Sequence, residues 1–273
     1  MKKLLFVGTS LAALAVASSA VAADMAVRAA PVYKAPPPAA ASFSWTGCYV
    51  GGHVGYGWGF KDFADVPGAP AFVSFLAPTT LRDDIKGVIG GGQVGCNYQF
   101  APNWVVGAEG SISGSGIRGD VSEPFFGGKG APNIQTFHAR TDWLASATGR
   151  LGYAWNQTLI YAKGGAAWAR DRYHVDETAF NCGGGINCSF DGSETRFGWT
   201  AGGGLEWAFA PNWAVQAEYD FYGFGKRDVT MTCSPAGAPG CTGRFVTNVG
   251  QQLHTVRLGI NYLFTATSVA AKY

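Results

Sequence analysis

Four segments of the chain alternate between apolar and polar positions, which is the period-two pattern of a β-strand with two different faces. They are residues 143–155, 197–209, 213–221 and 254–264. In each segment one face is almost wholly apolar, with aromatic side chains near its ends. The opposite face carries small and polar residues, among them Arg150, Glu206, Glu218 and Arg257. The pattern predicts strands whose two faces meet different surroundings.

A repeated pentapeptide shows where some of these strands turn. "FAPNW" occurs at residues 100–104 and again at 209–213, and the flanking residues 95–110 align without gaps on 204–219. Pro and Asn favour short turns, so each copy predicts a strand, a tight turn and a second strand. A third turn is predicted within "GYAWNQTLIY". The predicted turn residues are Pro102, Asn103, Asn156, Pro211 and Asn212.

Aromatic residues recur at nearly equal intervals beside these turns. They are Trp45, Phe100, Trp155, Phe209 and Phe264, which predicts that the chain returns repeatedly to one rim. Between the returns lie stretches without periodicity that are rich in Gly, Pro, Asp and Ser, as loops are. These predicted loops are residues 61–84, 119–136, 176–194 and 231–250. Four excursions predict an all-β fold, an eight-stranded antiparallel up-and-down transmembrane β-barrel over residues 44–264, with short periplasmic turns and long extracellular loops.

The ends of the chain have a different composition. Lys2 and Lys3 precede an apolar run and then small residues, which predicts a secretory signal peptide over residues 1–23 with cleavage near Ala22 or Ala23. A retained N-terminal membrane anchor is the alternative. Residues 24–43 are rich in Ala and Pro and are predicted to be an extended periplasmic linker. Residues 265–273 form a short extension after the predicted last strand.

The overall composition supports a lipid-facing wall. Aromatic residues make up 14% of the chain and charged residues only 14%, against about 25% charged residues in ordinary soluble domains. After the predicted signal peptide, no apolar run approaches the length of about 20 residues that a spanning helix needs. The net charge of +2 gives no indication of nucleic-acid binding, which requires clustered Lys and Arg.

Six charged residues fall on the face opposite the aromatic one, and both signs are represented. They are Glu109, Arg150, Lys163, Glu206, Glu218 and Arg257. A soluble barrel that binds a ligand would have the reverse arrangement, with apolar residues inside and charges outside. An eight-stranded barrel is just wide enough for side chains to fill it, so we expect these charges to form ion pairs that plug the lumen.

Six cysteines in an exported chain indicate disulfides. The candidate pairs are Cys48–Cys96, Cys182–Cys188 and Cys233–Cys241. Metal binding is the alternative, but the spacing does not resemble that of zinc sites. We therefore predict no metal.

No pattern indicates catalysis or a cofactor. Gly90, Gly92 and Gly95 match a dinucleotide fingerprint formally, but a strand end and a turn follow them in place of the required helix. The four histidines form no catalytic pattern and are expected to be structural or exposed. We predict that the protein is not an enzyme and needs no cofactor.

Several motifs together resemble one known family. "VYKAPPP", "SWTGCYVGGHVGYGWG", "GVIGGGQVGCNYQ" and the closing "HTVRLGINYLF" resemble the small outer-membrane β-barrels of alphaproteobacteria, called porin-like or outer-membrane immunogenic proteins. The resemblance implies the Gram-negative outer membrane and a barrel similar to the transmembrane domain of OmpA. It also implies a role in envelope integrity and surface interaction, with a narrow porin for ions or small solutes as the alternative.

The same resemblance implies partners. They are outer-membrane lipid and lipopolysaccharide, the barrel-assembly machinery, and unidentified surface ligands of the loops. The family usually ends at the aromatic residue of the last strand, whereas here "TATSVAAKY" follows Phe264.

Overall fold

The computed structural model describes residues 43–66, 80–126, 132–181, 187–234 and 244–264. All of them belong to the compact unit Ala41–Tyr273. The predicted signal peptide, the extension 265–273 and all of the predicted linker except Phe43 lie outside the described residues. No helix in the described part of the chain is long and apolar enough to cross a membrane.

The described residues form nine strand segments in a single sheet. The segments are β1 (Gly47–Asp65), β2 (Thr80–Gln99), β3 (Trp104–Ser115), β4 (Arg118–Phe126), β5 (Pro132–Trp155), β6 (Thr158–Asn181), β7 (Asn187–Ala210), β8 (Trp213–Ser234) and β9 (Arg244–Leu263).

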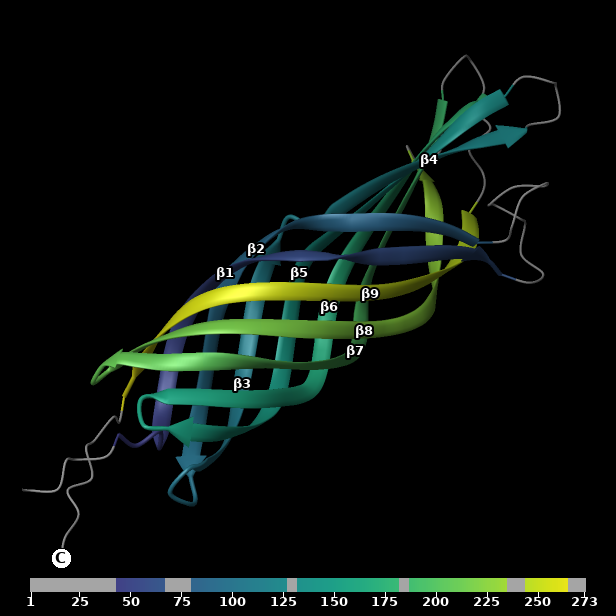
Figure 1. Ribbon diagram of the computed structural model, residues 1–273. Coiled ribbons are helices and arrows are strands. Elements are labelled where there is room, and N and C mark those ends of the chain that lie inside the picture. Colours follow the sequence, from purple (N-terminus) through teal and green to yellow (C-terminus); the bar gives the residue numbers. More distant parts are fainter. Residues whose placement is uncertain (1–42, 67–79, 127–131, 182–186, 235–243, 265–273) are drawn as a thin grey trace, which may run out of the picture. The chain divides into compact units, whose positions relative to one another are not determined.

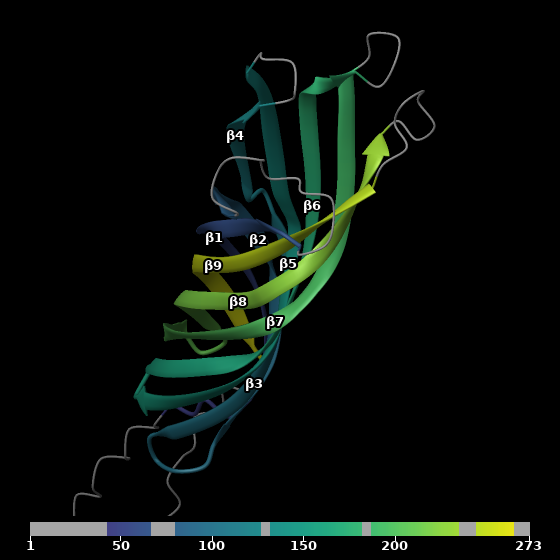
Figure 2. The same cartoon turned by 90° about the vertical axis from the view of Figure 1, so that its right-hand side faces the viewer.

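The sheet closes on itself. Consecutive strands pair antiparallel, and β1 pairs with both β2 and β9. β3 and β4 are two parts of one long strand, interrupted at Gly116 and Ile117, and both pair with β2 and β5. Figures 1 and 2 show the strands side by side in this order. The predicted eight-stranded antiparallel up-and-down barrel is therefore confirmed, with one of its eight strands broken in two.

The two faces of the wall differ as the alternation predicts. Along β5 the outward residues Leu151, Tyr153 and Trp155 are 50%, 49% and 79% exposed, whereas the inward residue Arg150 is 3% exposed. Aromatic side chains gather at two levels on the outward face. One level lies beside the short turns and the other about ten residues further along the strands, as in the aromatic girdles of outer-membrane barrels. The side chains between the two levels are mostly aliphatic or small.

The strands are longer than the sequence pattern predicts. Much of each predicted loop is strand: β1 continues to Asp65, β6 continues to Asn181, and β4 lies almost wholly within the predicted loop 119–136. Gly, Asp and Pro led to a loop prediction because they disfavour strands locally. In the closed sheet the neighbouring strands supply hydrogen-bond partners, and the ladder continues beyond the aromatic girdle.

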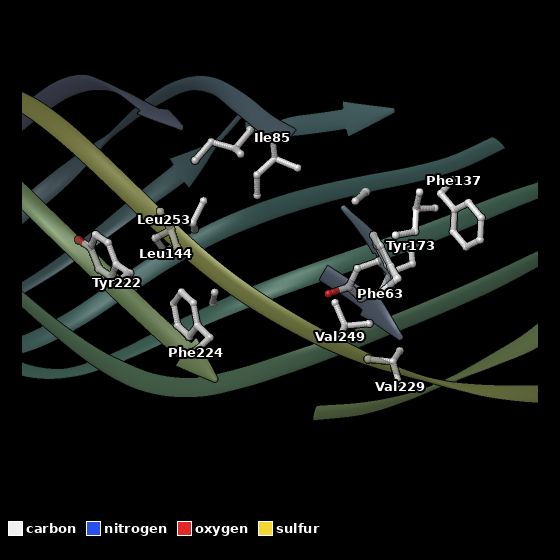
Figure 3. Packing of buried hydrophobic residues seen from close by; sticks show 14 of the residues in the cluster. Phe63, Ile85, Phe137, Leu144, Tyr173, Tyr222, Phe224, Val229, Val249 and Leu253 are labelled. Atoms are coloured by element: carbon white, nitrogen blue, oxygen red, sulfur yellow. The ribbon is translucent and has the colours of Figure 1, made fainter. Parts of the chain in front are cut away.

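The interior contains apolar clusters on both sides of a polar layer. The smaller cluster lies near the short turns and includes Trp45, Leu159 and Leu263. The larger cluster fills the extracellular half of the barrel, where Figure 3 shows Phe63, Tyr173 and other side chains from facing strands packed together. A layer of buried charges lies between these clusters, and a smaller charged group that includes Lys61 contacts Tyr173 of the larger cluster.

Trp45 lies at the predicted rim, but its side chain points inward, whereas those of Phe100, Trp155, Phe209 and Phe264 are exposed. Its side chain is 3% exposed, and its indole Nε1 donates a hydrogen bond to the carbonyl oxygen of Asn156 at 3.2 Å. Asn156 lies in the β5–β6 turn, across the ring from β1. Trp45 therefore spans the periplasmic mouth of the barrel, where burying the ring is more favourable than exposing it.

The repeated pentapeptide has a structural explanation. In each copy the Asn side chain donates to a carbonyl at the end of the neighbouring strand: Asn103 to Ala154 at 2.8 Å and Asn212 to Leu263 at 2.7 Å. The amide nitrogens of Ala154 and Leu263 donate back to the carbonyl oxygens of Asn103 and Asn212. Each copy thus makes a two-point connection between a turn and the next strand end.

We predict that Asn103→Ala and Asn212→Ala each lower the free energy of unfolding by about 1 kcal/mol, because each leaves a carbonyl without its side-chain donor. Urea unfolding of the protein in lipid vesicles, followed by tryptophan fluorescence, measures the change. Asn248→Ala is the control, since it removes an exposed hydrogen bond to Asp228. Equal losses in all three variants would show that the turn connections have no special role.

Candidate functional site

The six charged residues of the predicted lumen network all point into the barrel. Each comes from a different strand, and they are Glu109 (β3), Arg150 (β5), Lys163 (β6), Glu206 (β7), Glu218 (β8) and Arg257 (β9). All are buried, with exposed fractions between 0% and 6%. The structure brings the six together in one layer across the lumen.

Lys163 and Glu218 lie at the centre of this layer. Lys163 Nζ is 2.6 Å from a carboxylate oxygen of Glu218 and 3.1 Å from one of Glu109. Arg257 binds the same Glu218 oxygen and also contacts Asp220 at 2.6 Å. Lys163 reaches Asp220 as well, at 3.4 Å. Two cations therefore share three carboxylates, and most of these ion pairs join strands that are not adjacent.

Arg150 forms the other half of the layer. Its guanidinium lies 3.6 Å from Glu109 and 3.5 Å from Glu206, and its Nε donates to Asn97 at 2.7 Å. The same guanidinium lies over the rings of Tyr49 and Tyr161, 4.6 Å and 5.0 Å from their centroids. A planar cation between two aromatic faces gains cation–π attraction in addition to its ion pairs.

Several members of the network were not predicted from the sequence. They are Tyr49, Asn97, Tyr161, Asp220 and Asn261. The hydroxyl of Tyr49 donates to Glu109 at 2.6 Å, and that of Tyr161 donates to Glu218 at 2.8 Å. Strand alternation gives a signal for Asp220 and Tyr161, which stand two positions from Glu218 and Lys163 and so share their face. The sequence does not indicate which carboxylate accepts the hydrogen bond from the hydroxyl of Tyr49 or of Tyr161.

A second group of buried charges lies further toward the extracellular end and was also missed. Lys61 Nζ is 2.8 Å from Asp171, and Arg196 Nε is 3.2 Å from the same carboxylate. All three side chains have 0% exposure. Lys61 and Arg196 fall within or beside stretches predicted to be loops, so their inward direction was not predicted.

The structure contains one of the three candidate disulfides within its described residues. Cys48 and Cys96 are opposite each other on β1 and β2, with their Cα atoms 3.9 Å apart, and they form a disulfide on the outward face. Cys182, Cys241 and the side chain of Cys188 lie outside the description, so Cys182–Cys188 stays a prediction. Cys233 is disulfide-bonded.

The histidines have structural partners. His53 is buried and contacts Gln93 and Ser113 at 2.6 and 2.7 Å, while His254 on the wall contacts Tyr219 at 2.7 Å. His138 and His174 face each other on β5 and β6, at the extracellular end. Among the described residues, no group of three or more His, Cys, Asp or Glu side chains is arranged to hold a metal ion.

His174 and Asp191 form an exposed pair across β6 and β7, with Nδ1 2.6 Å from the carboxylate. The hydrogen bond to Asp191 raises the pKa of His174, and contact with Asp176 adds to the effect. Burial acts to raise the pKa of Asp191, but hydrogen bonds from His174 and Ser234 outweigh it, so that pKa is lowered. The pair stabilises the fold most between these two pKa values.

The closed sheet, its lipid-facing band and its filled lumen define a transmembrane β-barrel. Residues 9–264 match the family model described as "Outer membrane protein beta-barrel domain". The chain belongs to this family, and its location is the Gram-negative outer membrane.

Two relatives from Brucella match over nearly the whole chain. It is 32% identical to the 31 kDa outer-membrane immunogenic protein of Brucella melitensis, covering 91% of this chain and 95% of the relative. It is 28% identical to the 25 kDa outer-membrane immunogenic protein of Brucella abortus, covering 97% and 99%.

Two solved structures are more distant. The outer membrane protease OmpT of Escherichia coli aligns with 83% of this chain and 99% of its own, at 6% identity and a TM-score of 0.48. OprG of Pseudomonas aeruginosa aligns with 80% and 97%, at 10% identity and a TM-score of 0.41. Both scores are too low to carry an argument about function.

We predict that Glu218→Gln lowers the free energy of unfolding by about 3 kcal/mol, because it leaves Lys163 and Arg257 without their shared carboxylate in a buried layer. Urea unfolding in vesicles measures the loss. Glu218→Gln combined with Lys163→Met should lose less than the sum of the single changes. Glu194→Gln is the control, because this carboxylate is partly exposed and its two ion pairs are long, at 4.0 Å each. It should lower the free energy of unfolding by less than about 1 kcal/mol. A loss at Glu218 no larger than that of the control would contradict a stabilising network.

We also predict a pH dependence at the extracellular ends of β6 and β7. The pKa of His174 is higher in the folded than in the unfolded state. The stabilisation that His174 gives the fold is therefore complete below its unfolded-state pKa of about 6.5 and is lost as the pH rises through its folded-state pKa. Hydrogen exchange around residues 172–176 and 189–193, corrected for intrinsic rates, should therefore show more frequent opening at about pH 8 than at about pH 5.5. His174→Gln should remove this difference, and His254→Gln should preserve it.

Proposed function

We propose that the protein is a structural barrel of the outer membrane that catalyses no reaction, conducts little or nothing, and acts through its outer surface. The observation that carries this proposal is the lumen network of Glu109, Arg150, Lys163, Glu206, Glu218 and Arg257. Most of its ion pairs join strands that are two apart in the ring, and the guanidinium of Arg150 on β5 reaches the ring of Tyr49 on β1, so side chains occupy the path that a solute would need.

Two further barriers support a closed lumen. Trp45 spans the periplasmic mouth, and the apolar cluster containing Phe63, Leu144 and Leu253 fills the extracellular half. An ion moving through the barrel would have to cross both apolar layers as well as the charged one. Transfer of an ion into apolar surroundings is strongly unfavourable.

A narrow porin for ions or small solutes is the alternative. The observation that favours it is the polarity of the middle layer, where charged and hydroxyl groups would support hydrated ions if the apolar layers opened.

The remaining elements follow from the proposed role. Residues 1–23 would direct export and be removed near Ala22 or Ala23, and residues 24–43 would tether the barrel from the periplasmic side. The barrel-assembly machinery would bind β9, with its aromatic end at Phe264. Outer-membrane lipid and lipopolysaccharide would contact the wall, and the extracellular segments would contact surface ligands.

Planar-bilayer recording tests the proposal. We expect wild-type protein to give no discrete conductance steps above the baseline. Trp45→Ala combined with Glu218→Ala, Arg150→Ala, Phe63→Ala and Leu253→Ala should give measurable steps, because the changes open both apolar layers and remove two central charges. Trp104→Ala is the matched control, since this tryptophan is 46% exposed on the outward face. Regular steps in the wild-type protein would favour the narrow porin.

A further inference from the structure

Four cationic residues form a continuous row across the outward face of the barrel. Lys86 on β2 pairs in register with Arg118 on β4, Arg118 pairs with Arg140 on β5, and Arg140 pairs with Arg172 on β6. All four are exposed, and Arg170 is exposed one outward position before Arg172 on β6. We call Lys86, Arg118, Arg140 and Arg172 the cation row.

Such a row is unfavourable for the barrel alone, because like charges directly opposite each other on a sheet repel. One carboxylate compensates part of it: Asp142, at a bulge in β5, lies 3.1 Å from Arg140 Nε and 2.7 Å from Arg172 Nε. Within the described ranges, no ion pair engages Lys86, Arg118 or Arg170. Positive charge therefore exceeds negative charge along the row, and an anion bound there would relieve the repulsion.

The level of the row indicates where that anion would come from. On β2, Lys86 lies two residues closer to the extracellular end than Val88, an outward residue that is 68% exposed. On β5, Arg140 lies on the extracellular side of the bulge and Trp143 on the other side. On β6, Arg170 lies two residues closer to the extracellular end than Trp168. The row thus begins where the apolar band ends, on the extracellular side. Lipid headgroups of the outer leaflet, and their phosphates, lie at this level.

A groove continues outward from the row. It has a volume of about 700 Å³ and is lined by Arg140, Arg172, His138, His174 and Asp191, with hydroxyl groups from Ser193, Thr230 and Thr232. The planar guanidinium group of arginine can donate two parallel hydrogen bonds to phosphate oxygens. Hydroxyl and imidazole groups can donate hydrogen bonds to sugar hydroxyls and accept them. The combination fits a phosphorylated sugar better than a simple phospholipid headgroup.

We propose that the cation row binds the phosphates of a phosphorylated glycolipid headgroup in the outer leaflet, and that the groove holds its sugar. The proposal deepens the proposed function by giving a site to one of its surface partners, and it rests on that surface role. The outward residues of the row are separate from the lumen, so conductance and lipid binding can fail independently.

The test uses the full protein folded in detergent micelles and measures the binding of diphosphoryl lipid A. Lys86→Gln combined with Arg118→Gln should weaken binding about tenfold or more, because two charge-assisted contacts with phosphate oxygens are lost. This variant breaks no ion pair of the barrel and should still fold. Lys226→Gln combined with Arg227→Gln makes the same charge change on β8, across the ring from β4, and should weaken binding less than about twofold.

Two further arms identify the source of the anion. Monophosphoryl lipid A should bind more weakly than the diphosphoryl form, and inorganic phosphate at equal concentration should not compete. Unfolded material is recognised by the loss of the shift between heated and unheated gel samples, and the single change Arg118→Gln, within the row, then replaces the double variant.

Four outcomes would overturn the proposal. Equal weakening in the row variant and the β8 control would show a general charge effect, and no weakening in either would show that the row does not bind. Competition by inorganic phosphate as strong as that by lipid A, or tighter binding of a sulfated polysaccharide by the same residues, would assign the row to another anion.

Discussion

The structure depends on one constraint: hydrocarbon cannot hydrogen-bond to the peptide backbone. Each strand that crosses the membrane must therefore find partners along both of its edges, and a sheet can provide this only by closing on itself. The β1–β2 and β1–β9 ladders show how strictly this holds, since β1 is paired along nearly its whole length on both sides. The outward aromatic girdles and the short turns follow from the same requirement.

Closure with eight strands sets the width of the interior. The ring leaves room for side chains but not for a wide channel, so every inward residue must pack or pair with others. Charges in that space lose their hydration, and the structure compensates by sharing them: Glu218 accepts from Lys163, Arg257 and Tyr161. The same compactness places apolar side chains above and below the charged layer, which supports a barrel whose activity lies on its outer surface.

On the outer surface, charged side chains are governed by their contacts with headgroups and water. On the extracellular side of the apolar band the wall meets headgroups and water. An anion bound there would reduce the repulsion between neighbouring cationic side chains. The cation row, the bulge that positions Asp142 and the groove beyond it occupy this level. The extracellular extensions of β5, β6 and β7 are long enough to form such a surface because their ladders continue past the membrane.

The sequence by itself determined the fold class, the direction of each alternating face and six members of the lumen network. These follow from local regularities, because a strand places every second side chain on the same side whatever its neighbours are. It did not determine how far the strands extend, as the predicted loops 61–84 and 119–136 show. It also did not determine the inward turn of Trp45, the pairing of Tyr49 with Glu109, or the alignment of Lys86 with Arg118. Only the tertiary structure decided these, because they depend on the register between strands, and register sets which residues far apart in the chain meet.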